Sequence, residues 1–201
     1  MKIFLTSQAS EVMGKIVKML PKPPKDTKLA FIPTAGDPYG DNKPWMDADR
    51  AMLLKLGFVV EDFDLKNKSE AETREKLSDF DVIFVAGGNT FYLLAEAKKS
   101  GFDKVARELV QKGKIYIGSS AGSYIVCPTI EAAGWKKAGK NIVSLEDLSA
   151  LNLVDFIVTC HYSKEYKEAV DEGAKVSKYP VITLRDDQFI LADGKKFEVK
   201  E

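Results

Sequence analysis

A serine between two glycines is the pattern in this sequence most able to do chemistry. A short apolar run at residues 114–119 (KIYIGS) leads into Ser120, so that Gly118, Ser120 and Gly122 form Gly-x-Ser-x-Gly. A serine on a tight strand-to-helix turn exposes its hydroxyl above the sheet, and the next amide, here that of Ala121, can bind an oxyanion. The pattern predicts that Ser120 is a nucleophile. A tight turn with an inert serine is the alternative.

A serine hydroxyl needs a base to take its proton, and the usual base is a histidine that a carboxylate orients. The chain contains one histidine, His161, which follows an apolar stretch at residues 156–160. If that stretch and residues 115–117 are both strands of the sheet, Ser120 and His161 lie at the same edge of it. His161 is therefore the predicted base, and a purely structural histidine is the alternative.

A second glycine pair, Gly87 and Gly88, follows another apolar run at residues 82–85. The amide of Gly88 would be a second oxyanion donor at the same sheet edge. Asn89 and Thr90, which come next, are candidate substrate-binding residues. The alternative is an ordinary strand-to-helix turn in which Asn89 or Thr90 caps the helix. The segment lacks the lysine of a Walker phosphate loop and the spacing of a dinucleotide-binding glycine motif.

Strand-like apolar runs alternate with helix-like amphipathic segments over most of the chain. The expected strands are residues 2–6, 29–32, 58–63, 82–85 and 115–117, and the expected helices are 10–20, 45–56, 68–77, 89–100 and 102–112. The last third is more β-like, with strands expected at 156–160, 181–184, 188–192 and 196–199 and a helix at 164–174. This order predicts one α/β domain over residues 1–201 with a mainly parallel sheet. Its ligand crevice would lie beyond the carboxyl ends of the strands.

The composition is typical of a globular protein in a reducing compartment. Thirty basic and thirty acidic side chains cancel, so no charge excess points to nucleic acid or to a membrane surface. Cys127 and Cys160 are too few for a disulfide framework or a metal cluster, and no apolar run approaches the length of a membrane span. We therefore expect a cytoplasmic protein that binds neither nucleic acid nor membrane and uses no metal or cofactor.

Several segments, in the same order along the chain, resemble the dipeptidase E family of serine peptidases, which also includes cyanophycinases. They are residues 31–35 (FIPTA), 83–94 (IFVAGGNTFYLL), 116–122 (YIGSSAG), 127–130 (CPTI) and 150–156 (ALNLVDF). The resemblance implies a class I glutamine amidotransferase-like fold, which is a flavodoxin-like three-layer α/β sandwich with a mainly parallel central sheet. It also implies that Ser120 is the nucleophile, that His161 is the base, and that Gly88 and Ala121 supply the oxyanion hole.

The resemblance is incomplete at the acid that should orient His161. Aspartyl dipeptidases of the enteric type carry an aspartate a few residues after the Cys-Pro-Thr-Ile segment, where this chain has Trp135. Other members are similar in using a glutamate instead. Glu131 is therefore the predicted acid, and Glu146 and Asp147 are the alternatives.

The substrate is less determined than the chemistry. Aspartyl dipeptidases resemble one another in an arginine downstream of the histidine that binds the substrate's aspartate side chain, but residues 162–168 (YSKEYKE) contain none. Lys164, Lys167 and Arg185 are candidates, although each is more typical of a surface charge. We expect hydrolysis of small peptides, with Asp-X dipeptides as one candidate class, by a monomer or homodimer. A cyanophycinase-like or other amide hydrolase, or a non-catalytic binding protein on the same fold, is the alternative.

Overall fold

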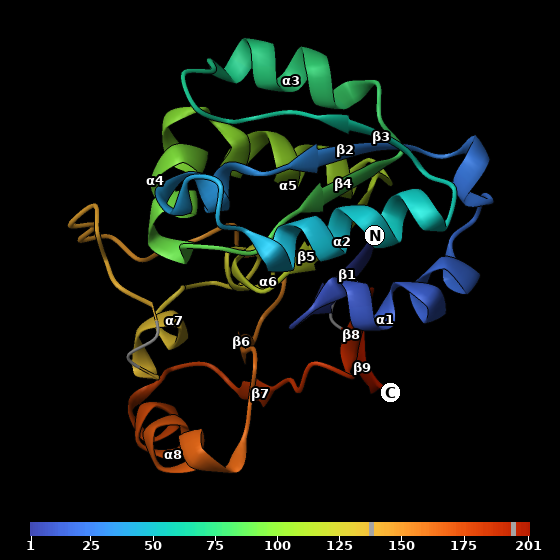
Figure 1. The fold of residues 1–201 in the computed structure, drawn as a ribbon. Coiled ribbons are helices and arrows are strands. Elements are labelled where there is room, and N and C mark those ends of the chain that lie inside the picture. The colour runs from blue at the N-terminus through green and yellow to red at the C-terminus, as the bar shows by residue number, and fades with distance from the viewer. Residues whose placement is uncertain (137–138, 194–195) are drawn as a thin grey trace.

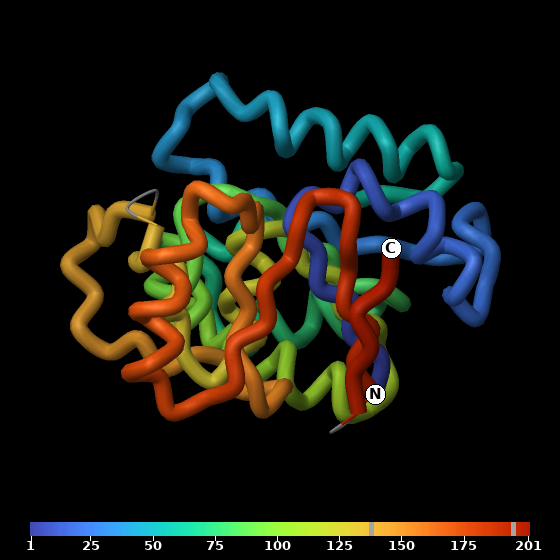
Figure 2. The backbone as a smooth tube through the Cα atoms, turned by 90° about the horizontal axis from the view of Figure 1, so that it is seen from below, coloured from blue at the N-terminus to red at the C-terminus, as the bar shows by residue number. Residues whose placement is uncertain are grey.

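The computed structural model describes residues 1–136, 139–193 and 196–201 and is built around a seven-stranded sheet. Its strands are β1 (Lys2–Thr6), β2 (Lys28–Ile32), β3 (Val59–Asp62), β4 (Val82–Val85), β5 (Ile115–Ser119), β8 (Phe189–Asp193) and β9 (Lys196–Lys200). They lie in the order β3-β2-β4-β5-β1-β8-β9 (Figure 1). The first five strands are parallel, and β8 and β9 extend the sheet beyond β1 as an antiparallel pair. Figure 2 shows these two strands, in red, beside the blue N-terminal strand.

Helices cover both faces of this sheet. The helices are α1 (Ala9–Ile16), α2 (Pro44–Lys55), α3 (Glu70–Ser78), α4 (Thr90–Lys99), α5 (Phe102–Gln111), α6 (Ala121–Tyr124), α7 (Ala132–Trp135) and α8 (Lys167–Val176). Of these, α7 and α8 pack against each other, away from the central sheet (Figure 1). Short 3₁₀ turns lie at Val17–Met19, Pro24–Asp26, Thr34–Tyr39 and Lys164–Tyr166. The predicted α/β class with a mainly parallel sheet between helical layers is confirmed.

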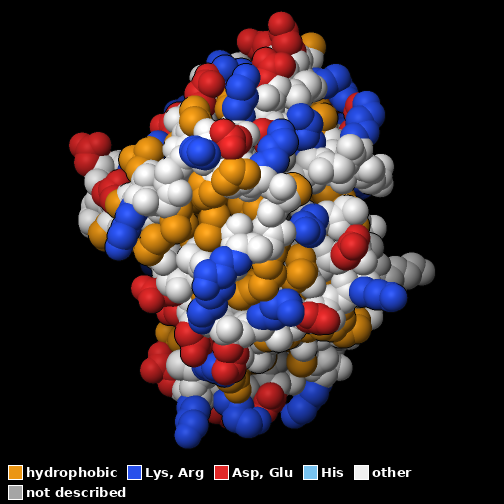
Figure 3. All heavy atoms as spheres, turned by 90° about the vertical axis from the view of Figure 1, so that its right-hand side faces the viewer, with side chains coloured by type: hydrophobic (Ala, Val, Ile, Leu, Met, Phe, Trp, Pro, Cys, Tyr) orange, Lys and Arg blue, Asp and Glu red, His pale blue; other side chains and the backbone are white. Residues whose placement is uncertain are grey.

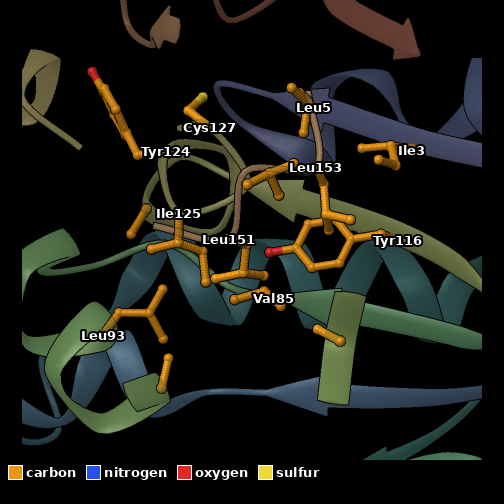
Figure 4. Packing of buried hydrophobic residues seen from close by; sticks show 14 of the residues in the cluster. Ile3, Leu5, Val85, Leu93, Tyr116, Tyr124, Ile125, Cys127, Leu151 and Leu153 are labelled. Carbon is orange, nitrogen blue, oxygen red and sulfur yellow. The ribbon is translucent and has the colours of Figure 1, made fainter. Parts of the chain in front are cut away.

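The sheet is apolar on both faces because successive side chains of a strand point in opposite directions. Against α1 and α2 lie Phe4, Phe31, Phe84 and Ile117. Against the helices of the other face lie Ile32 and also Leu5, Val85 and Tyr116, which are labelled in Figure 4. Burial on both faces explains why the inner strands read as continuous apolar runs rather than as alternating ones.

Two expected strands do not join the central sheet. Residues 156–160 form β6 (Ile157–Thr159), which pairs in parallel with β7 (Val181–Thr183) as a separate two-stranded sheet. The edge of the central sheet next to β1 is occupied by β8. The expectation that His161 and Ser120 follow strands of the same sheet is therefore wrong, and their meeting depends on how the small sheet packs against α6.

The surface agrees with the balanced charge of the sequence. Acidic and basic side chains are interspersed on the face shown in Figure 3, with apolar atoms between them. Within the described ranges, no helix has the length and apolar character needed to cross a membrane.

Candidate active site

Ser120 lies in the turn between β5 and α6, at the carboxyl edge of the sheet. Its backbone angles are φ 48° and ψ −106°, a conformation that costs energy for any residue with a side chain. The Ser120 amide donates to Thr6 O at 2.9 Å, and the amides of Ser123 and Tyr124 donate to Ser120 O at 2.8 and 3.1 Å. These hydrogen bonds hold the strained residue from both sides, so its position is fixed by the packed core beneath it.

The two glycines beside Ser120 lie where no side chain fits. A Cβ at Gly118 would lie 2.5 Å from Gly122 O, and a Cβ at Gly122 would lie 2.1 Å from Val85 O. Neither glycine has a positive φ. The requirement for glycine is therefore close approach of one main chain to another as the turn folds back over β4 and β5.

The hydroxyl of Ser120 is joined to an imidazole and then to a carboxylate. Ser120 Oγ lies 3.0 Å from His161 Nε2, and His161 Nδ1 lies 2.6 Å from Asp186 Oδ1. His161 also has a positive φ, 53°, and its amide donates to Ser7 Oγ at 3.0 Å. An imidazole held between a serine and a carboxylate is the arrangement that allows a histidine to take the serine's proton.

Asp186 replaces Glu131 as the carboxylate that contacts His161, so the acid predicted from the sequence is corrected. The Glu131 Oε1 atom accepts a hydrogen bond from Ser177 Oγ at 2.6 Å. The alternatives are also placed elsewhere, since Glu146 is exposed and Asp147 forms an ion pair with a lysine of α4.

A signal for Asp186 exists in the topology of the small sheet. β6 and β7 are parallel and pair Thr159 with Thr183. His161 and Asp186 follow these two strand ends by two and three residues, and carboxyl ends of parallel strands meet at one edge. The pairing is not evident from the sequence, because the apolar stretch before His161 is equally compatible with a strand of the central sheet.

A cavity of about 320 Å³ opens beside Ser120 and His161. Its walls include the rings of Tyr39 and Trp45, which meet edge to face at 5.1 Å, and the side chain of Gln8. A larger open hollow of about 540 Å³ lies against α3, but mostly charged side chains line it and it holds no candidate nucleophile. The smaller cavity combines aromatic walls with a few polar groups, as ligand sites generally do.

The two predicted oxyanion donors border this site. Gly88 lines the cavity, and its φ of 147° is open only to glycine, since a Cβ there would lie 2.1 Å from Ala35 O. Ala121 is the first residue of α6 and follows Ser120 directly. Within the part of the chain that the structure describes, the Gly88 and Ala121 amides donate to no protein acceptor. Both therefore stay the predicted donors, with Gly88 at the cavity wall and Ala121 buried.

Asn89 and Thr90 lie at the start of α4 and do not line the cavity. Asn89 Oδ1 accepts from the Tyr92 amide at 2.9 Å, and Asn89 Nδ2 donates to Lys140 O at 2.9 Å. The side chain of Asn89 is therefore engaged as a helix cap. A role of Asn89 and Thr90 in substrate binding stays a prediction.

Of the cations considered for substrate recognition, two are engaged in ion pairs. Lys167 pairs with an aspartate one turn further along α8, and Arg185 pairs with Asp187 and Glu201. Lys136, which the sequence analysis did not consider, lies next to the histidine. Its ammonium donates to Cys160 O, and burial lowers its pKa.

A buried carboxylate, that of Asp49, lies behind the cavity wall. Asp49 Oδ1 accepts from Gln8 Nε2 at 2.9 Å and from the Ser10 amide at 2.8 Å. Burial raises the pKa of Asp49 to about 6 from its ordinary value of 3.8, although hydrogen bonds from Ser119, Ser10 and Gln8 oppose the rise. Burial therefore disfavours the ionised form of Asp49 relative to the protonated form.

Replacing Asp49 with asparagine should stabilise the protein above neutral pH. A raised pKa in the folded state contributes stability while Asp49 is protonated, and that contribution is lost as the pH rises through about 6. The rise of the Asp49 pKa from 3.8 to about 6 corresponds to about 3 kcal/mol of folding stability. Urea unfolding at about pH 4 and about pH 8 should therefore show that the free energy of unfolding of Asp49→Asn increases relative to that of the wild type as the pH rises. Asp47→Asn, on the exposed side of the same helix, controls for loss of a charge. If the free energy of unfolding depends on pH in the same way for Asp49→Asn and for the wild type, the expectation is wrong.

Comparisons with known proteins indicate the family of the chain. The model of peptidase family S51 matches residues 3–200 of the chain. An uncharacterized peptidase of Listeria monocytogenes is 36% identical over 201 residues, which cover 98% of this chain and 97% of the relative. Peptidase E of Escherichia coli is 30% identical over 148 residues, covering 72% of this chain and 58% of the relative. The crystal structure of a candidate peptidase E protein from Listeria monocytogenes superposes with a TM-score of 0.87 at 33% identity, covering 99% of this chain and 97% of that one.

Proposed function

Because the chain belongs to peptidase family S51 and is a serine-type peptidase, we propose that Ser120 cleaves small peptides through an acyl-enzyme, with His161 as its base and Asp186 as the acid that orients the base. The observation that supports this assignment is the continuous contact from Ser120 Oγ through both ring nitrogens of His161 to Asp186 Oδ1. Asp186 accepts a hydrogen bond from Nδ1–H, which leaves Nε2 as the acceptor facing the serine.

The steps follow from this geometry. Ser120 Oγ attacks the carbonyl carbon of the peptide bond while His161 Nε2 takes its proton. The carbonyl oxygen becomes an oxyanion, which the amides of Gly88 and Ala121 bind. His161 then gives the proton to the leaving amine, the C–N bond breaks, and the acyl group stays on Ser120. Water, deprotonated by His161, attacks the ester carbonyl, and Ser120 regains its proton as the acid product leaves.

The small cavity beside Ser120 favours short substrates over long chains. Its volume, about 320 Å³, is at the lower end of the range for ligand sites. Asp-X dipeptides are the short substrates that the resemblance of this sequence to the dipeptidase E family implies. We therefore take Asp-X dipeptides as the first substrates to test. Cleavage of β-aspartyl peptides in preference to Asp-X dipeptides would instead assign the site to a cyanophycinase-like hydrolase. The expected cytoplasmic location and the oligomeric state stay predictions.

A fluorophosphonate probe tests for an activated serine without knowledge of the substrate. Ser120 Oγ should bond to phosphorus and displace fluoride as His161 takes the proton. We expect the added mass, measured by peptide mass spectrometry, on the peptide that contains Ser120. Unfolded protein is the control, because only the folded site brings His161 to the serine. Equal labelling of folded and unfolded protein, or no labelling of the folded protein, would exclude the proposed function.

A further inference from the structure

Trp45 makes a hydrogen bond that the proposed mechanism has not used. It is the second residue of α2, and its indole Nε1 donates to Gly87 O at 3.3 Å. Gly87 lies between the indole and the serine, since a Cβ built on Gly87 would lie 3.5 Å from Trp45 Cδ1 and 3.2 Å from Ser120 Cβ. The indole therefore contacts the peptide unit that carries the Gly88 amide.

The direction of this hydrogen bond decides the direction of the Gly88 amide. The Gly87–Gly88 peptide is trans, so its C=O and N–H point to opposite sides. With Gly87 O bound to the indole, the Gly88 N–H points away from Trp45. Because Gly88 lines the cavity beside Ser120, this orientation suits an oxyanion donor.

Within the described ranges, the bond from Trp45 is the hydrogen bond to Gly87 O, and the Gly88 amide donates to no protein acceptor. The same peptide joins two glycines, so no Cβ hinders rotation of the peptide plane between its neighbours. The next amide, that of Asn89, is held separately by Ala35 O at 2.8 Å. The hydrogen bond from Trp45 is therefore the contact that distinguishes this orientation of the Gly87–Gly88 peptide from the reversed one.

Trp45 itself is held firmly enough to perform this role. Its backbone carbonyl accepts from Gln8 Nε2 at 3.3 Å, and the same Nε2 donates to the buried Asp49. Its ring packs edge to face against Tyr39. Hydrogen bonds and packing from independent elements thus fix the backbone and the ring of Trp45.

We propose that Trp45 is a positioning residue whose indole N–H holds the Gly87–Gly88 peptide with the Gly88 amide facing the oxyanion. This inference rests on the proposed function. It goes beyond it by assigning the orientation of the oxyanion hole to a side chain on a different element. Trp45 acts through the Gly88 amide and takes part in no proton transfer.

The variant Trp45→Phe keeps an aromatic ring and removes the N–H. Loss of an oxyanion donor typically lowers kcat by about 10²- to 10³-fold, so loss of its orientation should lower the rate of fluorophosphonate labelling by about 10- to 100-fold. With a cleaved dipeptide, kcat should fall in parallel and KM should change by less than about threefold, because the contact matters in the transition state. Trp135→Phe is the matched control, since Trp135 does not line the cavity.

The chain has two tryptophans, so a sharper experiment is available. In the Trp135→Phe protein, β-(3-benzothienyl)alanine can replace tryptophan at position 45 alone. This isostere keeps the shape of the indole and carries sulfur in place of the N–H. It should label as slowly as Trp45→Phe. Labelling at the rate of the Trp135→Phe protein would overturn the inference, because shape rather than the hydrogen bond would then explain the Trp45→Phe result.

The outcomes separate this inference from the proposed function. If the wild type is not labelled at Ser120, the proposed function fails and the inference fails with it. If the wild type is labelled and Trp45→Phe is labelled equally fast, only the inference fails. A circular dichroism spectrum and an unfolding midpoint close to those of the wild type establish that a slow variant is folded.

Discussion

Replacing Ser120 with alanine should abolish peptide hydrolysis and leave the fold intact. The nucleophile is lost, and kcat should fall by about 10⁴- to 10⁶-fold, as it does when a serine of a catalytic triad is removed. The Ser120 side chain donates to or accepts from His161 at the mouth of the cavity, so its removal leaves no buried group without a partner. We expect the free energy of unfolding to change by less than about 1 kcal/mol.

Two measurements check this expectation. Steady-state hydrolysis of the best dipeptide gives kcat and KM, and urea unfolding gives the stability. Ser163→Ala, an exposed serine outside the cavity, is the matched control and should hydrolyse normally. Hydrolysis by Ser120→Ala within about tenfold of the wild type would remove Ser120 from the mechanism.

Replacing Asp186 with asparagine should produce the second largest loss. In the proposed mechanism the carboxylate keeps Nδ1 of His161 protonated, across an oxygen–nitrogen distance of 2.6 Å. An asparagine amide donates where the carboxylate accepts, which favours the wrong tautomer, and kcat should fall by about 10³- to 10⁴-fold while KM changes little. The measurement is the kinetics of the same dipeptide, with labelling of Ser120 as an independent readout.

Two other carboxylates, those of Glu131 and Asp187, serve as controls for this test. Glu131→Gln should retain nearly full activity, because Glu131 contacts Ser177 rather than His161. Asp187→Asn, next to Asp186, should also remain active, since Asp187 pairs with Arg185. A loss in Glu131→Gln as large as that in Asp186→Asn would show that the contact seen at His161 is not the one that matters for catalysis.

Residue types in the sequence predict those parts of the site that depend on local backbone geometry. Gly118 and Gly122 can be recognised in the sequence because two main chains approach too closely for any Cβ, and both positions lie within two residues of Ser120. Gly88 can be recognised for the same reason, since a Cβ there would lie 2.1 Å from Ala35 O. The inner strands can be recognised as continuous apolar runs, because helices cover both faces of the sheet. His161 is readable because the chain holds no other histidine.

The small sheet of β6 and β7 shows where the prediction of the fold ends. The apolar stretch at 156–160 predicts a strand but not its partner, since a short strand pairs wherever neighbouring backbone is free. β8 occupies the edge of the central sheet next to β1, and β6 pairs with β7 instead. That choice brings the strand ends before His161 and Asp186 together.

The sequence by itself determined the α/β framework and the turn at Ser120, because each depends on residues close together in the chain, and it left His161 as the one histidine available as a base. Only the tertiary structure decided which acid and which aromatic ring complete the site. Asp186 lies 25 positions from His161, and Trp45 lies 42 positions from Gly87. Asp186 stands between Arg185 and Asp187 in what reads as an ordinary charged turn. Such contacts follow from the relative placement of whole elements, which no local pattern encodes.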